Sequence, residues 1–331
     1  MINGRAWRVM RFGEPKGAIE AVEQTWAEPD PGQVLIRVRT AGAGYPDAMM
    51  TAGAFPLLGD PPFGLGEEAA GEVIAVPAGS RFAIGDQVTG ITAFLQGWGG
   101  YGEYAYLLEH SMIRIPAGMT DEQAGGFPIG FRTAYAGLVE RAALAAGETV
   151  LVLGAAGSSG STAVQLAKAL DAHVIAVVGN RDKAEFIARR GADHVINHGR
   201  EDVTARIAEI TDGRGVDLIY DPVGGALATT AMDSLGRNGR MAMMGLASGT
   251  PATIEPIALM LRNHSAVGVL AVPLDDSDAE DAVWDRLAQL AAGGTITTPV
   301  GPVYDFADVP LMVAEQAKVA PGKVIVRVAT A

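Results

Sequence analysis

Residues 149–170 read TVLVLGAAGSSGSTAVQLAKAL, and this stretch orders a strand, a glycine-rich turn and a helix. The run Thr149–Leu153 is apolar and branched, as is typical of a strand buried on both faces of a parallel sheet. Gly154 allows a sharp reversal, Gly157 lets a phosphate approach the backbone, and Gly160 lets the helix lie close to the strand. An ordinary tight turn would need neither the strand nor the helix. The stretch therefore predicts a dinucleotide site at a helix N-terminus.

Composition narrows the class of protein. The chain has 331 residues, 49% of them hydrophobic, which favours two domains. A net charge of −13 and a pI of about 4.8 argue against a nucleic-acid partner. No apolar run reaches the roughly 18 residues of a membrane span, and the first residues lack the apolar region of a secretory signal. We therefore expect a cytoplasmic protein that acts without a membrane.

Cysteine is absent from the chain. The protein can therefore form no disulfide, no thiol nucleophile and no thiolate metal site.

The first part of the chain is β-rich, with closely spaced Gly and Pro turns, and could form a partly closed barrel. Near Thr120 the pattern changes, and Thr120 with Gln123 predicts a capping box at a helix start. The expected strands of this first part are Arg5–Met10, Gln33–Arg39, Glu72–Val76, Gln87–Ile91 and Gly102–Leu108.

The middle part alternates strands with helices, which predicts a parallel, doubly wound sheet. A helix over Arg132–Ala145 precedes it, and an apolar strand over Ala266–Val272 follows it. The expected strands are Val150–Leu153, His173–Val178, His194–Ile196, Leu218–Asp221 and Arg240–Gly245. The expected helices are Ser161–Leu170, Lys183–Arg190, Val203–Ile210 and Ala226–Leu235. The last elements are helices over Ala282–Ala291 and Val309–Ala317 and a strand over Lys323–Ala329.

Short motifs in a fixed order carry a family resemblance across nearly the whole chain. They are Ala43–Asp47, Gly64–Gly71, Gly85–Val88, Gly154–Gly160, Gly191–Asp193 and Gly322–Val326. The sequence resembles the medium-chain dehydrogenase/reductase superfamily, and within it the zinc-free quinone oxidoreductase (zeta-crystallin-like) group.

The resemblance implies an α/β protein with two domains. A GroES-like, β-rich catalytic domain would comprise residues 1–124 and 266–331, and a doubly wound Rossmann domain that binds NADP would comprise residues 125–265. The active site would lie in the cleft between them. A homodimer is implied too, and Ala266–Val272 is our candidate for the joining edge, since an unpaired apolar edge is a liability. The alternative is an interior strand of the sheet.

The resemblance also bears on metal binding. Zinc-bearing relatives place a Cys and a His at the positions that are Gly44 and Glu67 here, so we expect no metal. His194 and His198 flank a strand end, and we interpret the histidines as solvated or strand-end residues. Many quinone reductases of the group carry Asn where Gly44 stands, which puts quinones in doubt as the natural substrate.

Without a metal, hydrogen bonds must stabilise the negative charge that hydride transfer places on a substrate oxygen. Tyr45 is the catalytic candidate, because the resemblance places its loop beside the nicotinamide and its phenol can donate a hydrogen bond or a proton. The alternative is a packed aromatic residue that lines the cleft. The matching Asp47 looks structural.

The cofactor preference rests on the residues after the second strand. NAD-binding relatives carry an acid there that binds the ribose, but this chain has Gly179, followed by Asn180, Arg181 and Lys183. Without a carboxylate there is no repulsion of a 2′-phosphate, and the cations Arg181 and Lys183 can pair with it, which favours NADPH over NADH. The alternative is that Arg181 and Lys183 are the solvated start of a helix. The predicted cofactor-binding residues are Thr133, Gly154, Ala155, Gly157, Ser158, Ser159, Gly160, Gly179, Asn180, Arg181, Lys183, Gly245 and Lys323.

Thr133 enters this set because it matches a family threonine near the nicotinamide, although it could be a plain helix hydroxyl.

The leading hypothesis is a zinc-independent, NADPH-dependent reductase of quinones or enones, with a carbonyl reductase as a close alternative. A redox sensor or structural protein that binds the nucleotide with little turnover is the alternative from another class. An apolar substrate wall, or simply core, would come from Phe55, Phe63, Phe94, Leu95 and Trp98.

Overall fold

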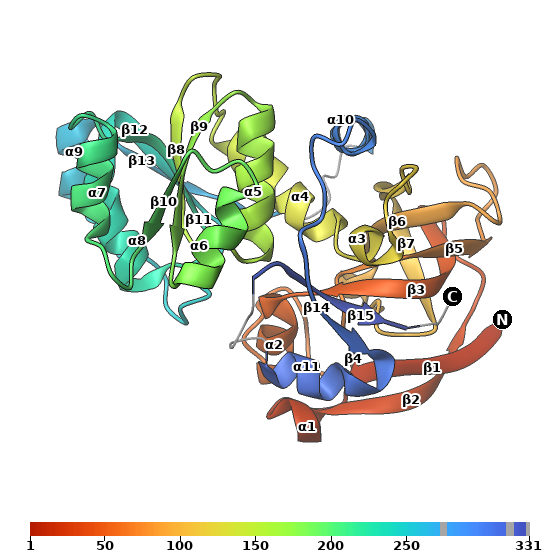
Figure 1. Cartoon of the computed structure of the whole chain (residues 1–331). Coiled ribbons are helices and arrows are strands. Elements are labelled where there is room, and N and C mark those ends of the chain that lie inside the picture. The colour runs from red at the N-terminus through yellow and green to blue at the C-terminus, as the bar shows by residue number, and fades with distance from the viewer. Residues whose placement is uncertain (272–276, 316–320, 329–331) are drawn as a thin grey trace. The chain divides into compact units, whose positions relative to one another are not determined.

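The computed structural model describes residues 1–271, 277–315 and 321–328, and these residues form two compact units (Figure 1). The first, here called the β unit, comprises Met1–Ile129 and Pro273–Ala331. The second, here called the α/β unit, comprises Gly130–Val272. The chain thus enters the α/β unit once and returns to the β unit.

The β unit is built around strand β3 (Gln33–Ala43), which is buried at nearly every residue. It pairs antiparallel with β5 (Glu68–Ala75), β7 (Tyr104–Arg114) and β15 (Lys323–Arg327). The sheet order is β14-β15-β3-β5-β6-β7, and the extra pairing of β3 with β7 closes part of it into a barrel. The predicted partly closed barrel is therefore confirmed. The flanking strands are β6 (Gln87–Thr92) and β14 (Val300–Asp305).

A second sheet in this unit has the order β2-β1-β4. Strand β1 (Ile2–Val9) pairs along its whole length with β2 (Ile19–Trp26), which the sequence reading missed. Only the two end residues of β2 are buried, so its apolar alternation is weak. The remaining elements are β4 (Phe63–Gly64), α1 (Pro15–Ala18), α2 (Tyr45–Ala52), α3 (Asp121–Gly125), α10 (Ser277–Ala292) and α11 (Val309–Glu315).

The capping box at Thr120 is confirmed. Its hydroxyl accepts from the amide of Gln123 at 3.2 Å, and its own amide donates to Gln123 Oε1 at 2.9 Å. The helix that follows, α3, has only five residues.

The α/β unit holds a six-stranded parallel sheet with the order β10-β9-β8-β11-β12-β13. The order reverses between β8 and β11, so the sheet is doubly wound as predicted. Helices α5 and α6 lie on one side of the sheet and α7 and α8 on the other (Figure 1). The strands are β8 (Thr149–Val152), β9 (His173–Val178), β10 (His194–Asn197), β11 (Val216–Asp221), β12 (Leu235–Met243) and β13 (Ser265–Gly268). The helices are α5 (Ser158–Ala169), α6 (Arg181–Ala188), α7 (Val203–Ile210), α8 (Gly225–Ala231) and α9 (Pro256–Arg262).

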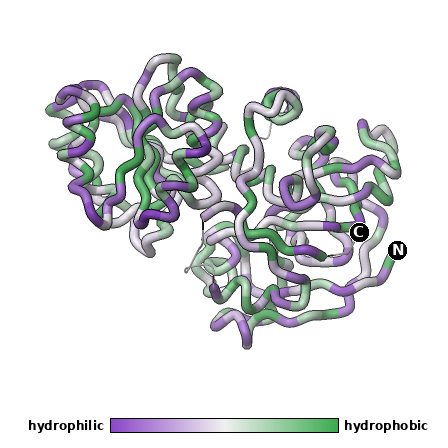
Figure 2. The backbone as a smooth tube through the Cα atoms, viewed as in Figure 1, coloured by the Kyte–Doolittle hydropathy of each residue, from purple (hydrophilic) through white to green (hydrophobic). Residues whose placement is uncertain are grey.

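The core of this unit explains why its elements were predictable. Leu151, Ile175, Val177 and Ile219 from the central strands belong to one buried cluster, and apolar residues concentrate along these strands in Figure 2. Burial on both faces leaves the short, unbroken apolar runs that the sequence shows.

Some bounds differ from those expected. The helix expected over Arg132–Ala145 begins earlier, as α4 (Pro128–Tyr135), and continues as a π-helical turn over Ala136–Arg141. The apolar strand expected over Ala266–Val272 is the shorter β13, and residue 272 lies outside the described residues. The ends of two other expected elements, at 316–317 and 329, also lie outside them. Among the described helices, none is long and apolar enough to cross a membrane.

Candidate functional site

The glycine-rich turn after β8 is built as its sequence requires. Gly154 has a φ of +58°, a left-handed conformation that favours glycine. A Cβ on Gly160 would lie 2.4 Å from the Gly154 carbonyl oxygen, so any side chain there would push the helix off the turn. A Cβ on Gly157 would meet nothing nearer than 3.4 Å. Gly154 and Gly160 are therefore required by the backbone conformation and the close packing of the turn. Gly157 leaves its backbone uncovered by any side chain.

Helix α5 begins at Ser158, with Gly157 as its N-cap. The sequence predicts its start at Ser161, three residues later. Three predicted residues, Ser158, Ser159 and Gly160, thus form the first turn. Amides at this position have no intrahelical acceptor, and the positive end of the helix dipole lies there. The amide of Ala155, by contrast, donates to the Val177 carbonyl at 3.0 Å and is already engaged.

The end of β9 carries the residues predicted to select the cofactor. Gly179 has no side chain, and a Cβ there would lie 3.3 Å from Nε2 of His198. Asn180 caps α6, because its Oδ1 accepts from the amide of Lys183 at 2.9 Å, which leaves its NH₂ group as a donor. Arg181, with a side chain 79% exposed, donates from Nε to Glu185 at 2.8 Å.

His198 is a residue that the sequence reading missed, since it was interpreted as a strand-end histidine. It follows β10, which pairs in parallel with β9 and ends opposite Val178. The amide of His198 donates to the Val178 carbonyl at 3.0 Å, which holds the backbone of His198 beside the end of β9. The available signal was the predicted pairing of two adjacent strands that both end at this edge.

Two further predicted residues lie in the α/β unit and two in the β unit. Gly245 follows β12, and a Cβ there would lie 2.6 Å from the Pro222 carbonyl oxygen. Thr133 is half-buried on α4. Tyr45 and Lys323 belong to the β unit. The cofactor roles of all thirteen residues stay predictions.

A buried cluster of acids lies in the β unit. Asp47, 1% exposed, accepts from the amides of Gly44 at 2.9 Å and Gly66 at 3.1 Å and from the Tyr101 hydroxyl at 2.7 Å. These three donors tie α2 to the β4–β5 connection and to Tyr101, in agreement with the structural role expected for Asp47. Burial raises the pKa of Asp47, and the three donors oppose that rise.

Glu68 and Lys323 form an ion pair inside this cluster, with side chains 1% and 4% exposed. The other carboxylate oxygen of Glu68 accepts from the Ile129 amide at 2.8 Å. The predicted cofactor ligand Lys323 is therefore engaged by an acid of its own unit. The carboxyl group of neighbouring Glu67 has no hydrogen-bond partner among the described residues, and burial together with the charge of Asp47 raises its pKa to about 8.

Tyr45 is the first residue of α2, a helix where the sequence reading expected a loop. Its side chain is half-buried, and its hydroxyl makes no hydrogen bond with any described residue. Two of the aromatic residues offered as a substrate wall, Phe63 and Phe94, are each 4% exposed and belong to the core. Trp98 packs edge-on against Tyr106 with ring centres 5.0 Å apart.

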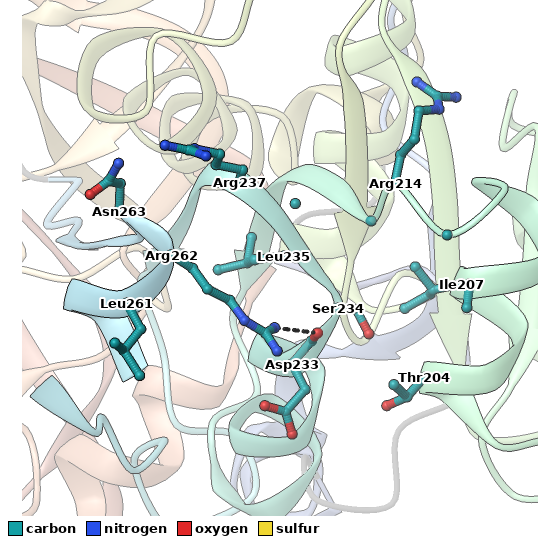
Figure 3. Close-up of a pocket in the computed structure, with 14 residues that line it drawn as sticks. Thr204, Ile207, Arg214, Asp233, Ser234, Leu235, Arg237, Leu261, Arg262 and Asn263 are labelled. Carbon is teal, nitrogen blue, oxygen red and sulfur yellow. Dashed lines mark hydrogen bonds between the residues drawn. The ribbon is translucent and has the colours of Figure 1, made fainter. Parts of the chain in front are cut away.

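A cavity of about 590 Å³ lies at the other end of the parallel sheet, where β11 and β12 begin. Of its arginines, Arg262 points inward and donates to the Asp233 carbonyl at 3.3 Å, while the heads of Arg214 and Arg237 point apart (Figure 3). The cavity contains none of the predicted site residues. Phosphates that bind at strand carboxyl ends would lie away from it.

Comparisons with known proteins agree with this architecture. Residues 30–117 match a family model described as alcohol dehydrogenase GroES-like domain, and residues 160–295 match one described as zinc-binding dehydrogenase. Quinone oxidoreductase from Pseudomonas aeruginosa is 33% identical over 302 residues, which cover 90% of this chain and 91% of the relative. Prostaglandin reductase-3 from Mus musculus is 34% identical over 289 residues, 82% of this chain and 72% of the relative.

Among solved structures, Escherichia coli quinone oxidoreductase complexed with NADPH superposes with a TM-score of 0.88 at 27% identity, covering 98% of this chain and 100% of that one. The doubly wound sheet, the match to a GroES-like domain and these relatives together define a medium-chain dehydrogenase/reductase. The chain belongs to this superfamily, and within it to the quinone oxidoreductase group. Its members bind a nicotinamide cofactor.

The residues of this chain fit that cofactor, because the bare backbone at Gly157 and the first turn of α5 form a cradle that a Cβ at Gly160 would destroy. They do not fit the zinc that one family description mentions. No thiolate exists in the sequence, and glycine stands at position 44. Among the described residues, no three His, Asp or Glu side chains are grouped to hold a metal ion.

Proposed function

We propose that this protein is an NADPH-dependent oxidoreductase that transfers a hydride, without zinc, to a quinone or to an activated alkene such as an enone. The electron acceptors are suggested by two kinds of relative, quinone oxidoreductases and prostaglandin reductase-3. The reduced nicotinamide, when bound, supplies the hydride. The chain supplies the phosphate site, the choice of cofactor and a hydrogen-bond donor for the substrate oxygen.

The end of β9 carries the proposal. A carboxylate at this position would bond the ribose hydroxyl of NAD and repel an additional phosphate. Gly179 has none, and the space beside it holds the imidazole of His198, with Nε2 3.3 Å from where a side chain would begin. Arg181 uses only Nε for Glu185, so its terminal N–H groups can bind a phosphate. This set of groups favours the 2′-phosphate of NADPH.

Tyr45 is the proposed donor to the substrate oxygen. Its hydroxyl is not consumed by any described residue, whereas the Tyr101 hydroxyl is bound to Asp47 at 2.7 Å. A donor aimed at the oxygen where charge develops lowers the barrier to hydride transfer.

The test mixes the protein with NADPH or NADH and a panel of quinones, enones and aldehydes, and follows the loss of absorbance of the reduced cofactor. We expect tighter binding of NADPH and turnover of quinones or enones. Turnover of enones alone would agree with Gly44, and turnover of aldehydes alone would favour a carbonyl reductase. Binding of NADPH without turnover of any acceptor would contradict an enzymatic role and favour a sensor or structural protein.

We also propose that two copies associate through the edge of the parallel sheet. Strand β13 is the last strand of the sheet, and Leu270 beyond it is 64% exposed. Helix α9, directly before β13, exposes Ile257, Met260 and Leu261 by 71%, 76% and 80%. Apolar surface at an unpaired edge favours association.

Light scattering coupled to gel filtration tests the association. We expect twice the chain mass of 34.2 kDa for the wild type and a shift toward one chain mass for Leu261→Asp. Ile84→Asp, at a 70% exposed site of the β unit, is the matched control. A monomeric wild type would refute the association.

A further inference from the structure

A buried tyrosine lies next to the glycine-rich turn. Tyr220 is on β11, the strand that neighbours β8 across the point where the strand order reverses. Its side chain is fully buried, and its hydroxyl oxygen lies 2.7 Å from Oγ of Ser159, the second residue of α5. A Cβ on Gly137 would lie 2.8 Å from the Tyr220 ring, so the ring is tightly enclosed. The phenol is therefore held in one place beside the first turn of the helix.

The direction of this hydrogen bond follows from counting partners. Ser159 is the one hydrogen-bond partner of the Tyr220 hydroxyl among the described residues. If Ser159 donated, the phenolic hydrogen would be buried without an acceptor, which costs about 1–3 kcal/mol. Tyr220 therefore donates and Ser159 accepts. Burial also raises the pKa of Tyr220, so the phenol keeps its hydrogen at any physiological pH.

Two other hydroxyls near the start of α5, those of Ser161 and Thr162, already donate to backbone carbonyls. Ser161 donates to the Gly157 carbonyl at 2.6 Å, and Thr162 donates to the Gly130 carbonyl at 2.9 Å. Ser159 is half-buried and makes no other side-chain hydrogen bond with a described residue. Because its oxygen accepts from Tyr220, its own hydrogen remains free to be donated.

We propose that Tyr220 is a positioning residue for the phosphates of the dinucleotide: it holds the Ser159 hydroxyl so that its hydrogen is donated to a phosphate oxygen at the N-terminus of α5. This inference rests on the proposed binding of NADPH at the turn. In this arrangement the Ser159 hydroxyl is a side-chain donor in addition to the backbone amides, and Tyr220 on β11 sets the direction of its hydrogen. Since hydrogen bonds to charged acceptors are the stronger ones, the contribution to affinity should be measurable.

A double-mutant cycle tests it, with the Kd for NADPH measured by fluorescence titration of full-length protein. We expect Ser159→Ala to raise the Kd about tenfold. Tyr220→Phe should raise it by a large part of that factor, and the double variant should be no weaker than Ser159→Ala. Ser159→Thr keeps the hydroxyl and should retain most of the affinity. A merely structural role for Tyr220 would weaken binding equally in the presence and absence of the serine hydroxyl.

Tyr106→Phe is the matched control, because it removes another buried phenol, one that donates to the Ala27 carbonyl at 3.0 Å in the β unit. Its Kd should equal that of the wild type. Urea unfolding of each variant confirms that it is folded. A Tyr220→Phe protein that binds NADPH as tightly as the wild type, or multiplicative losses in the double variant, would overturn the positioning role alone. A wild type that does not bind NADPH would overturn the proposed function together with it.

Discussion

Glu67→Gln is expected to stabilise the β unit near neutral pH. The Glu67 carboxyl is buried, has no hydrogen-bond donor among the described residues, and has a pKa raised from 4.5 to about 8 by burial and the charge of Asp47. At pH 7 it is neutral in the folded chain and ionised in the unfolded chain. Each pH unit between 4.5 and 7 then costs about 1.36 kcal/mol, which gives a penalty of about 3 kcal/mol. The amide is neutral in both states and avoids this penalty.

The sign fixes the pH window. Because folding raises this pKa, the favourable contribution of Glu67 is complete below about pH 4.5 and is lost as the pH rises toward about 8. The advantage of the glutamine variant should therefore be near zero at pH 4.5 and about 3 kcal/mol at pH 7, and it should level off at about 5 kcal/mol above pH 8.

Urea unfolding followed by tryptophan fluorescence measures the effect, since Trp7, Trp26, Trp98 and Trp284, all four in the chain, lie in the β unit. Glu23→Gln, at an exposed site on β2, is the control and should change the free energy of unfolding by less than about 0.5 kcal/mol. A Glu67→Gln protein no more stable than the wild type at pH 8, or a difference that stays constant from pH 5 to 8, would refute the reasoning.

Three further changes test the site. Gly179→Asp places a carboxylate beside His198 and should raise the Kd for NADPH relative to that for NADH at least tenfold; an unchanged ratio would contradict the assignment of this strand end. Lys323→Met leaves Glu68 buried without its cation and should lower the free energy of unfolding by about 3–5 kcal/mol in urea, whereas a loss below about 1 kcal/mol would argue against the ion pair. Tyr45→Phe should lower kcat about a hundredfold with the Kd for NADPH unchanged, and full activity would exclude Tyr45 as the donor.

The α/β unit was predictable because each of its elements carries its own signal. Strand β9 and helix α7 were predicted with the bounds that they have, and the glycine-rich turn lies between β8 and α5 as expected. These signals are local: a strand buried on both faces reads as an unbroken apolar run, and an amphipathic helix repeats every 3.6 residues. The sequence pattern predicts the start of α5 three residues too late, because glycine and serine are weak helix formers and hide the first turn.

The β unit gave weaker signals. Strand β2 buries only its two ends, and α2 begins at Tyr45, inside the motif Ala43–Asp47, where the sequence predicts a loop. Pro46, in the first turn of α2, is a sequence signal for the start of a helix. The contacts inside the acid cluster could not be predicted for a different reason. Tyr101 bonds Asp47 from 54 positions away, and Lys323 pairs with Glu68 across an even longer separation, so no local pattern connects them.

One signal of the acid cluster was nevertheless present in the sequence. Glu67 and Glu68 stand together inside a stretch of glycine, alanine and leucine, where charged residues are rarely left without partners. The three acids differ in their partners. The Asp47 carboxylate accepts from three donors, and the Glu68 carboxylate pairs with Lys323 and accepts from the Ile129 amide. The Glu67 carboxyl has no hydrogen bond or ion pair among the described residues. A buried carboxyl without a donor keeps its proton to a higher pH, and the nearby charge of Lys323 opposes this rise in the pKa of Glu67 only in part. Glu67 should therefore make the stability of the β unit depend on pH between about 4.5 and 8, and a single substitution isolates this contribution.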